Sequence, residues 1–266
     1  MKNRVTFPVA HLRAAFILLF VAASAVLPSG PAQAGHISLF FDSSGRRIPA
    51  EGGGRNAARY ARTDEGDPLG NVTREYYPVS GGSFTEIMRT VGENEPYNRK
   101  AGRRLPWKLD WTVGLSYDYS YKYLVDDAGE KLHAAIEISG IALRDSGTAT
   151  LPSLIDDTSL NPVEKNLWEG YLANITTHCR DVFSIVRDPK IAKEVRDRLG
   201  EINYLIFDYS GDMDIGATIE SYLQEDAARA GQDWVREING RIAAYEEVTG
   251  FGALPEKRKQ FFDKFP

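Results

Sequence analysis

Apolar and aromatic residues occupy every second position over one long stretch of the chain, from Trp107 to Tyr123. Strict alternation over this length is typical of a β-strand with one buried face. The stretch is long for one flat strand, so we expect a bend, most simply at Gly114. Asp126 to Gly129 is typical of a hairpin turn. A second alternating stretch follows, and its parity shifts at Gly140, which predicts a β-bulge.

The spacing becomes helical in the second half of the chain. We first expect a loop rich in Gly, Ser and Thr that contains Leu151 and Pro152. An Asn-Pro pair then supplies an N-cap and a first-turn proline for a long helix over residues 161–187, and an Asp-Pro pair starts another over 188–199. Residues 201–209 fit either a helix or a strand. A final helical region covers roughly 217–248, with Gly231 as a possible interruption.

The residues before 107 are less regular. We expect one short strand at 36–41 and a glycine-rich, mixed-charge loop after it, so that 35–73 forms a loosely ordered segment. Residues 74–79 predict a strand, which Pro78 places at a sheet edge or strand end. Ser83 and Glu86 form a capping-box pattern, and the helix they open should end at Gly92 or Pro96.

These elements predict an α+β fold. An antiparallel sheet is built around the hairpin of residues 107–143 and packs against the long helix over 161–187 and the C-terminal helices. The tyrosines at odd positions from Tyr117 to Tyr123 are expected on its buried face, although they could instead line a groove that holds extended peptide. The tail, 253–266, contains three phenylalanines and predicts a docking helix rather than a membrane or partner motif.

The first residues are typical of a targeting segment. Lys2, Arg4 and Arg13 precede a short apolar run over 14–27, and Ala32-Gln33-Ala34 matches a small-residue cleavage site. The run is shorter than the roughly 20 residues that span a bilayer. We therefore expect residues 1–34 to be a signal peptide and the mature protein to be periplasmic or secreted.

Composition narrows the function classes. The chain has 32 Lys and Arg against 37 Asp and Glu, a formal net charge of −5, and loss of the basic leader makes the mature chain more acidic. A nucleic-acid binder is usually basic, so we expect no nucleic-acid partner. No second apolar segment follows the leader, so we expect no membrane span in the mature chain. Cys179 is the single cysteine, and its place on an apolar helix face favours a buried thiol.

The helix over 161–187 contains the candidate chemistry. Its apolar residues recur at helical spacing, and His178 and Cys179 lie within the same stripe. A histidine on a buried helix face is either a core residue or the remnant of a metal site. A zinc hydrolase with an HExxH motif needs two histidines four residues apart on one helix face and a glutamate beside the first.

The sequence resembles the bacterial secreted Zn-dependent protease family, which is catalogued as a domain of unknown function. In that family a strand pair and a Leu-Pro motif precede a helix with W-x-x-F-x-x-x-L-x-x-H-E-x-x-H, and a later helix ends in Y-D-x-x-T-x-H-G. The resemblance covers residues 74–252 and implies a zincin-like scaffold. The matching positions here are Trp168, Tyr171, Ile175, His178, Cys179 and Val182, and then Tyr245, Glu246, Thr249, Phe251 and Gly252.

The departures from the family pattern fall on the catalytic positions. Cys179 replaces the general-base glutamate, Val182 the second histidine and Phe251 the third, so that His178 is the only surviving metal-ligand position. Catalytic zinc usually has three protein ligands, and one imidazole cannot supply them. We therefore regard His178, Cys179, Val182, Tyr245 and Phe251 as vestigial positions, with no catalytic or metal-binding residue among them.

Three functional hypotheses follow. The first is an exported, catalytically inactive member of this family without a cofactor, which binds an unknown protein or peptide or has a structural role. The second is an active zinc peptidase with substitute ligands such as Asp181 or Cys179. Adjacent residues on a helix point about 100° apart, which disfavours chelation of one ion by both His178 and Cys179. The third is a periplasmic module of envelope assembly. His133, with outward parity in the hairpin, and His36 are expected to lie away from His178.

Overall fold

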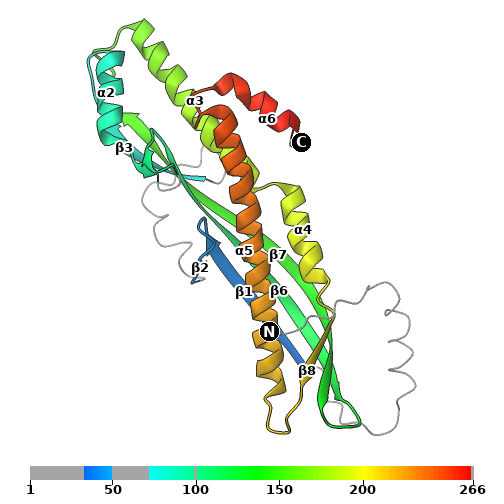
Figure 1. Ribbon diagram of the computed structural model, residues 1–266. Helices are drawn as coiled ribbons and strands as arrows, with labels where there is room; N and C mark the ends of the chain where they lie inside the picture. Colours follow the sequence, from blue (N-terminus) through cyan, green and yellow to red (C-terminus); the bar gives the residue numbers. More distant parts are fainter. Residues whose placement is uncertain (1–32, 50–71, 99–100, 265–266) are drawn as a thin grey trace.

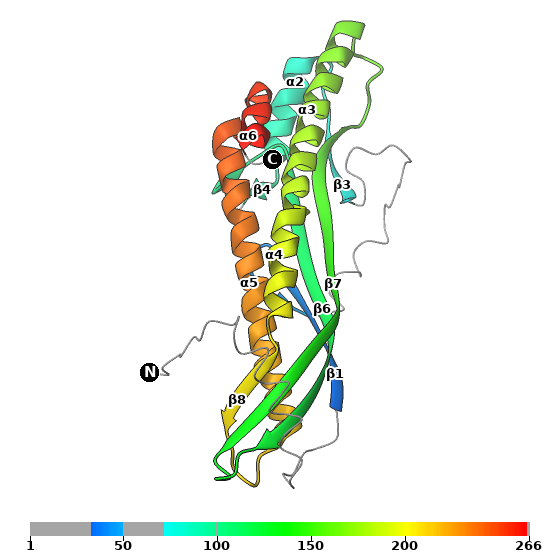
Figure 2. The same cartoon turned by 90° about the vertical axis from the view of Figure 1, so that its right-hand side faces the viewer.

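The computed structural model describes residues 33–49, 72–98 and 101–264. One twisted sheet forms one layer, and the helices α3, α4 and α5 cover one of its faces (Figures 1 and 2). The predicted α+β class is confirmed. The predicted signal peptide lies outside the described residues except for Gln33 and Ala34.

The centre of the sheet is the predicted hairpin. Strand β6 (Lys108–Val125) pairs antiparallel with β7 (Lys131–Leu154), and Gly129, with φ 71°, lies in the connecting turn. The register shifts between Ser116 and Asp118, opposite Gly140, whose φ is 61°. A glycine in the left-handed region within a register shift forms a β-bulge, which confirms that prediction. The irregularity does not fall at Gly114, where the missing Cβ makes room for the Phe40 ring.

The predicted loop around Leu151 and Pro152 is wrong, because β7 continues through both residues to Leu154. This part of the strand is hydrogen-bonded on both sides, to β6 and to β3. Gly147 lies within the strand, close to helix α3. A Cβ at this position would lie 2.8 Å from Cε2 of Phe183 on α3. The glycine therefore permits close helix–sheet packing and does not mark a turn.

The expectation of an antiparallel sheet needs correction, because the sheet is mixed. Strand β3 (Val72–Val79) pairs in parallel with β7 at one edge of the order β2-β1-β6-β7-β3. Between β3 and β7 the chain passes through α2, the small β4–β5 ladder and β6, so the parallel pair has the long connection that it requires. The alternation of apolar residues does not depend on strand direction, so it could not show this.

The remaining strands complete the sheet. Strand β1 (Gln33–Asp42) is longer than the predicted short strand and pairs antiparallel with β6 over ten residues. Residues 201–209, which fitted either state, contain strand β8 (Tyr204–Asp208), antiparallel to the start of β7. Short β2 (Arg47–Ile48) flanks β1, while β4 (Tyr97–Asn98) and β5 (Arg103–Arg104) form a separate ladder.

The helices begin at the predicted caps. Helix α2 (Phe84–Asn94) begins after Ser83, whose side chain accepts from the Glu86 N–H, and ends before Pro96. Asn161 and Glu164 form a capping box on α3 (Pro162–Val186). The others are α4 (Pro189–Gly200), α5 (Ile215–Thr249), the 3-10 helix η2 (Pro255–Lys257) and α6 (Arg258–Lys264).

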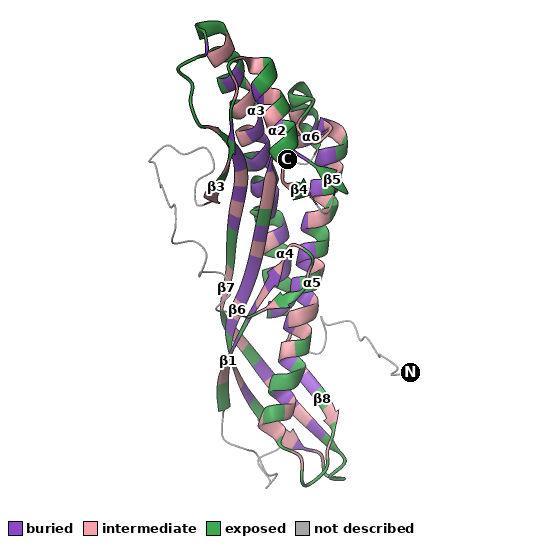
Figure 3. Cartoon of the chain, turned by 90° about the vertical axis from the view of Figure 1, so that its left-hand side faces the viewer, coloured by how far each residue is buried: buried purple, intermediate pink, exposed green. Residues whose placement is uncertain are grey.

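The main core lies between the sheet and the helices, as the buried residues along β6, β7 and α5 show (Figure 3). The Tyr117 hydroxyl donates to the Leu223 carbonyl of α5 at 3.1 Å, so the tyrosine face is covered and does not form an open groove here. Gly231 does not interrupt α5. A Cβ at this position would lie 2.1 Å from Cε2 of Phe41, so the glycine lets β1 pack against the helix.

The tail folds back as the docking helix α6. Phe261 is buried and packs edge-on against Tyr245 of α5, with ring centroids 5.1 Å apart. In the described part of the chain, no helix is both long enough and apolar enough to cross a membrane.

Candidate functional site

Residues of the two sequence motifs meet where α3, the end of α5 and the start of β6 come together. Helix α3 contributes His178, and α5 contributes Tyr245 and Glu246. Trp107, just before β6, and the turn that follows α5 lie against the same imidazole. The structure thus brings His178 of the first motif into contact with Tyr245 and Glu246 of the second.

His178 is held by a carboxylate and enclosed by rings. It is 1% exposed, and its Nε2 lies 3.1 and 3.2 Å from the two carboxylate oxygens of Glu246. Nε2 therefore bears a proton and donates to this carboxylate. The Trp107 and Tyr245 rings pack against the imidazole with centroids 4.7 and 5.1 Å away. Its Nδ1 is buried and has no hydrogen-bond partner among the described residues.

A left-handed turn covers the other edge of the imidazole. Gly250, Phe251 and Gly252 have φ of 57°, 58° and 89°, and Gly250 is the C-cap of α5. A Cβ on Gly252 would lie 3.1 Å from Cγ and Nδ1 of His178, so only glycine allows this approach without a shift. Phe251 is a strained residue of a kind that clusters at ligand sites. Its N–H donates to the Glu246 carbonyl, and its own carbonyl accepts from Nε1 of Trp107 at 3.4 Å.

The two replaced positions on α3 belong to the core. Cys179 and Val182 are 0% and 3% exposed and lie in the main hydrophobic cluster. Burial raises the pKa of the Cys179 thiol, and the nearby Glu246 carboxylate raises it further. The neutral thiol is therefore the stable form, and it is a poor nucleophile and a poor metal ligand.

Asp181 faces a different set of partners. Its carboxylate accepts from the Tyr245 hydroxyl at 2.7 Å and from two guanidinium nitrogens of Arg258 on α6. Burial, and then the hydrogen bond to Asp181, raise the pKa of the Tyr245 hydroxyl. The carboxylate offered above as a substitute ligand is thus committed to anchoring the tail. An aspartate within the apolar stripe of α3 was the available signal that such a partner exists.

The donor set does not fit a catalytic zinc ion. Within residues 33–49, 72–98 and 101–264, no group of three His, Cys, Asp or Glu side chains could hold a metal. His36 pairs with Asp118 at 2.8 Å, and His133 contacts the Tyr204 hydroxyl, so neither reaches His178. At the site itself only His178 and Glu246 offer donors, which is fewer than zinc requires.

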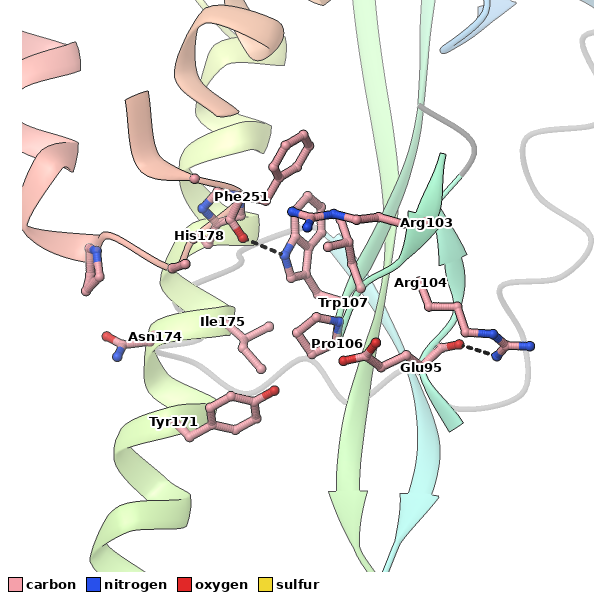
Figure 4. Close-up of a pocket in the computed structure, with 15 residues that line it drawn as sticks. Glu95, Arg103, Arg104, Pro106, Trp107, Tyr171, Asn174, Ile175, His178 and Phe251 are labelled. Atoms are coloured by element: carbon pink, nitrogen blue, oxygen red, sulfur yellow. Dashed lines mark hydrogen bonds between the residues drawn. The ribbon is translucent and has the colours of Figure 1, made fainter. Parts of the chain in front are cut away.

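A cavity of about 470 Å³ opens beside His178 (Figure 4). Its apolar wall includes Trp107, Pro106 and Ile175, and its polar groups come from Tyr171 and Asn174 of α3, from Glu95 after α2 and from the β5 arginines. This volume is in the range of small-ligand sites. The sequence indicated Tyr171 and Trp107 only as core residues, and it gave no signal for Glu95 or Arg103, because those side chains come together only in the folded chain.

Comparison with known proteins adds the family. A model of the family described as "Bacterial protein of unknown function (DUF922)" matches residues 74–252. The chain belongs to this family. DUF922 membership confirms the expected relation to a bacterial family of unknown function, and the match includes the β6–β7 hairpin, α3, α5 and the left-handed turn. Comparisons with curated proteins and with solved structures gave no match.

Proposed function

We propose that this DUF922 protein is a catalytically inactive relative of secreted Zn-dependent proteases that binds a protein or peptide in the cavity beside His178. We further propose that it is exported to the periplasm or beyond, as the basic leader and its cleavage motif suggest. Both parts depend on the residues at the site and not on the family description, which names no activity.

One observation supports the proposal above all. The positions that would supply a general base and two further metal ligands are Cys179, Val182 and Phe251. The remaining histidine, His178, uses its Nε2–H for a hydrogen bond to the Glu246 carboxylate. A buried polar cavity that has lost its ion would be unstable, and apolar volume at these positions removes that instability. The binding cavity next to them is retained, so the site keeps a shape for a ligand without the groups for hydrolysis.

A zinc analysis of the mature protein tests the loss of catalysis. We expect well below one equivalent of zinc after purification without added metal, and no chelator-sensitive cleavage of an unfolded protein substrate. About one equivalent of zinc in the wild type, lost in His178→Ala, would contradict the proposal.

The family relationship is tested by restoring the missing groups. The triple variant Cys179→Glu, Val182→His and Phe251→His should acquire about one equivalent of zinc, because its donors come from the same positions in α3 and in the turn. The left-handed backbone at position 251 tolerates histidine better than most residues. The same triple variant with His178→Ala is the control and should bind much less. A triple variant that folds but takes up no zinc would argue against a protease-like scaffold.

A further inference from the structure

The cavity beside His178 contains a carboxylate that has no partner among the described residues. Glu95 follows the last residue of α2, and its side chain is directed toward Tyr171 and Ile175 (Figure 4). Within the described residues the carboxylate has neither an ion pair nor a hydrogen bond, although it is partly buried. Burial raises the pKa of Glu95, and the neighbouring Arg104 and Arg103 partly oppose this effect. A desolvated carboxylate of this kind gains when a cation or a donor reaches it.

A guanidinium without a carboxylate partner lies on the other side of the same cavity. Arg103 extends over the ring of Phe251, with its Cζ 4.9 Å from the ring centroid. No ion pair joins it to any described residue, and the cation–π contact leaves its N–H donors available. Arg104, its neighbour in β5, is different, because its guanidinium already donates to the backbone carbonyl of Glu95 at 2.7 Å (Figure 4).

The two charges are close enough for Arg103 to influence Glu95, but they are not within ion-pair distance of each other. The Trp107 ring lies between them, and Ile175 and Tyr171 lie on the side of the Glu95 carboxylate (Figure 4). The Tyr171 hydroxyl has no hydrogen-bond partner among the described residues. Opposite charges that are held apart across an apolar wall are complementary to a ligand with both charges. A ligand with one charge would satisfy only one of the two groups: an anion would leave the partly buried Glu95 carboxylate unpaired, and a cation would leave the exposed Arg103 guanidinium unused.

We infer that the cavity takes a zwitterionic ligand, a short peptide with both termini free. Its ammonium group contacts Glu95, its carboxylate contacts Arg103, and an aromatic side chain lies between Trp107 and Ile175. Bidentate recognition of a carboxylate suits the planar guanidinium of Arg103. The inference rests on the proposed function, since it gives the ligand class for the same non-catalytic site.

Calorimetric titration with four forms of one dipeptide tests the inference. The probes are Ala-Phe, N-acetyl-Ala-Phe, Ala-Phe-amide and the doubly blocked N-acetyl-Ala-Phe-amide. We expect Ala-Phe to bind most tightly, each single block to weaken binding at least tenfold, and the double block to weaken it most. Equal affinity for the free and doubly blocked dipeptides would overturn the inference, and so would the absence of binding by all four.

Variants assign each terminus to its residue. In Glu95→Gln the free and N-acetylated dipeptides should bind alike, while the acid and the amide remain distinct. Arg103→Gln should show the opposite pattern. Two control variants should retain wild-type discrimination: Glu93→Gln, two residues earlier on α2 and paired with Arg89, and Arg47→Gln on β2. If either site variant kept the full preference for its terminus, the assignment would be wrong.

Mass spectrometry of the dipeptides after incubation separates the two proposals. If Ala-Phe is recovered intact and the blocked forms do not bind, the result supports both the lack of catalysis and the zwitterionic ligand class. Cleaved Ala-Phe overturns the lack of catalysis in the proposed function, while the comparison of blocked and free forms still decides the ligand class. Blocked dipeptide that binds as well as free dipeptide, and is recovered intact, overturns the ligand class alone.

Discussion

The buried pair of His178 and Glu246 allows a quantitative test of whether the imidazole is now a structural group. The two side chains are 2% and 8% exposed, and no other described residue contacts the Glu246 carboxylate by a hydrogen bond or ion pair. Replacing His178 by Leu therefore leaves a buried carboxylate with no partner. Removal of one partner from a buried pair typically costs about 3–5 kcal/mol.

The reverse single change and the double change complete the cycle. Glu246→Leu leaves a buried imidazole N–H unsatisfied, which costs about 1–3 kcal/mol. The double variant, with Leu at both positions, removes both polar groups together and should be within about 1.5 kcal/mol of wild type, because apolar replacement of a whole pair is often close to neutral. The coupling between the two positions should thus exceed about 2 kcal/mol.

Urea unfolding followed by tryptophan fluorescence and by far-ultraviolet circular dichroism measures these differences. Trp107 packs on the imidazole, so fluorescence reports on the site, and agreement between the two probes supports two-state analysis. The single His178→Leu change should lower the midpoint of thermal unfolding by roughly 6–20 °C for a chain of this size. A loss below about 1 kcal/mol, or a double variant as unstable as the sum of the singles, would refute the structural role.

Three further outcomes follow from particular contacts. Gly231→Ala should destabilise the fold by about 1–3 kcal/mol, because the added Cβ meets the Phe41 ring. Gly240→Ala on the same helix has open space around it and should stabilise the fold by up to about 1 kcal/mol. Equal effects of the two changes on urea unfolding would contradict this expectation. Because burial raises its pKa, the Cys179 thiol should resist alkylation at pH 8 in the folded protein and react fully in denaturant, as mass spectrometry of the labelled chain would show. Arg258→Ala leaves the buried Asp181 carboxylate with one hydrogen-bond donor, the Tyr245 hydroxyl, and a longer 3.9 Å contact to Arg180. Limited proteolysis should therefore release the tail earlier than in the control Lys259→Ala, and equal rates would exclude the Arg258 ion pair as the anchor.

The elements could be predicted where a local pattern determines them. The alternation over β6, the Asp126–Gly129 turn and the bulge at Gly140 depend on side-chain parity and glycine conformation, which neighbouring residues fix. The parallel pairing of β3 depends on a distant partner strand, and the continuation of β7 depends on Phe183 fitting over Gly147. Neither is encoded within a window of sequence, so local reasoning described the second as a loop.

The site, too, could be predicted only where a local sequence pattern determines it. His178, Tyr245 and Glu246 could be placed together because two spaced motifs on two helices imply a common geometry. The cavity could not be predicted, since Glu95 follows α2 and Arg103 lies in the two-residue strand β5, and this short region has no repeating pattern. Loop residues of this kind often carry binding specificity on a rigid scaffold.

The side chains that face the core and those that face the cavity contribute differently to the fold. Val182 and Cys179 are buried in the main hydrophobic cluster, so their apolar packing stabilises the contact of α3 with the sheet. Glu95, Arg103 and Tyr171 face the cavity, where unpaired polar groups give the apo-protein no stability. Polar groups that are unfavourable in the empty protein are best explained by a ligand that satisfies them. The affinity of such a ligand should therefore depend on these three side chains and be insensitive to Val182.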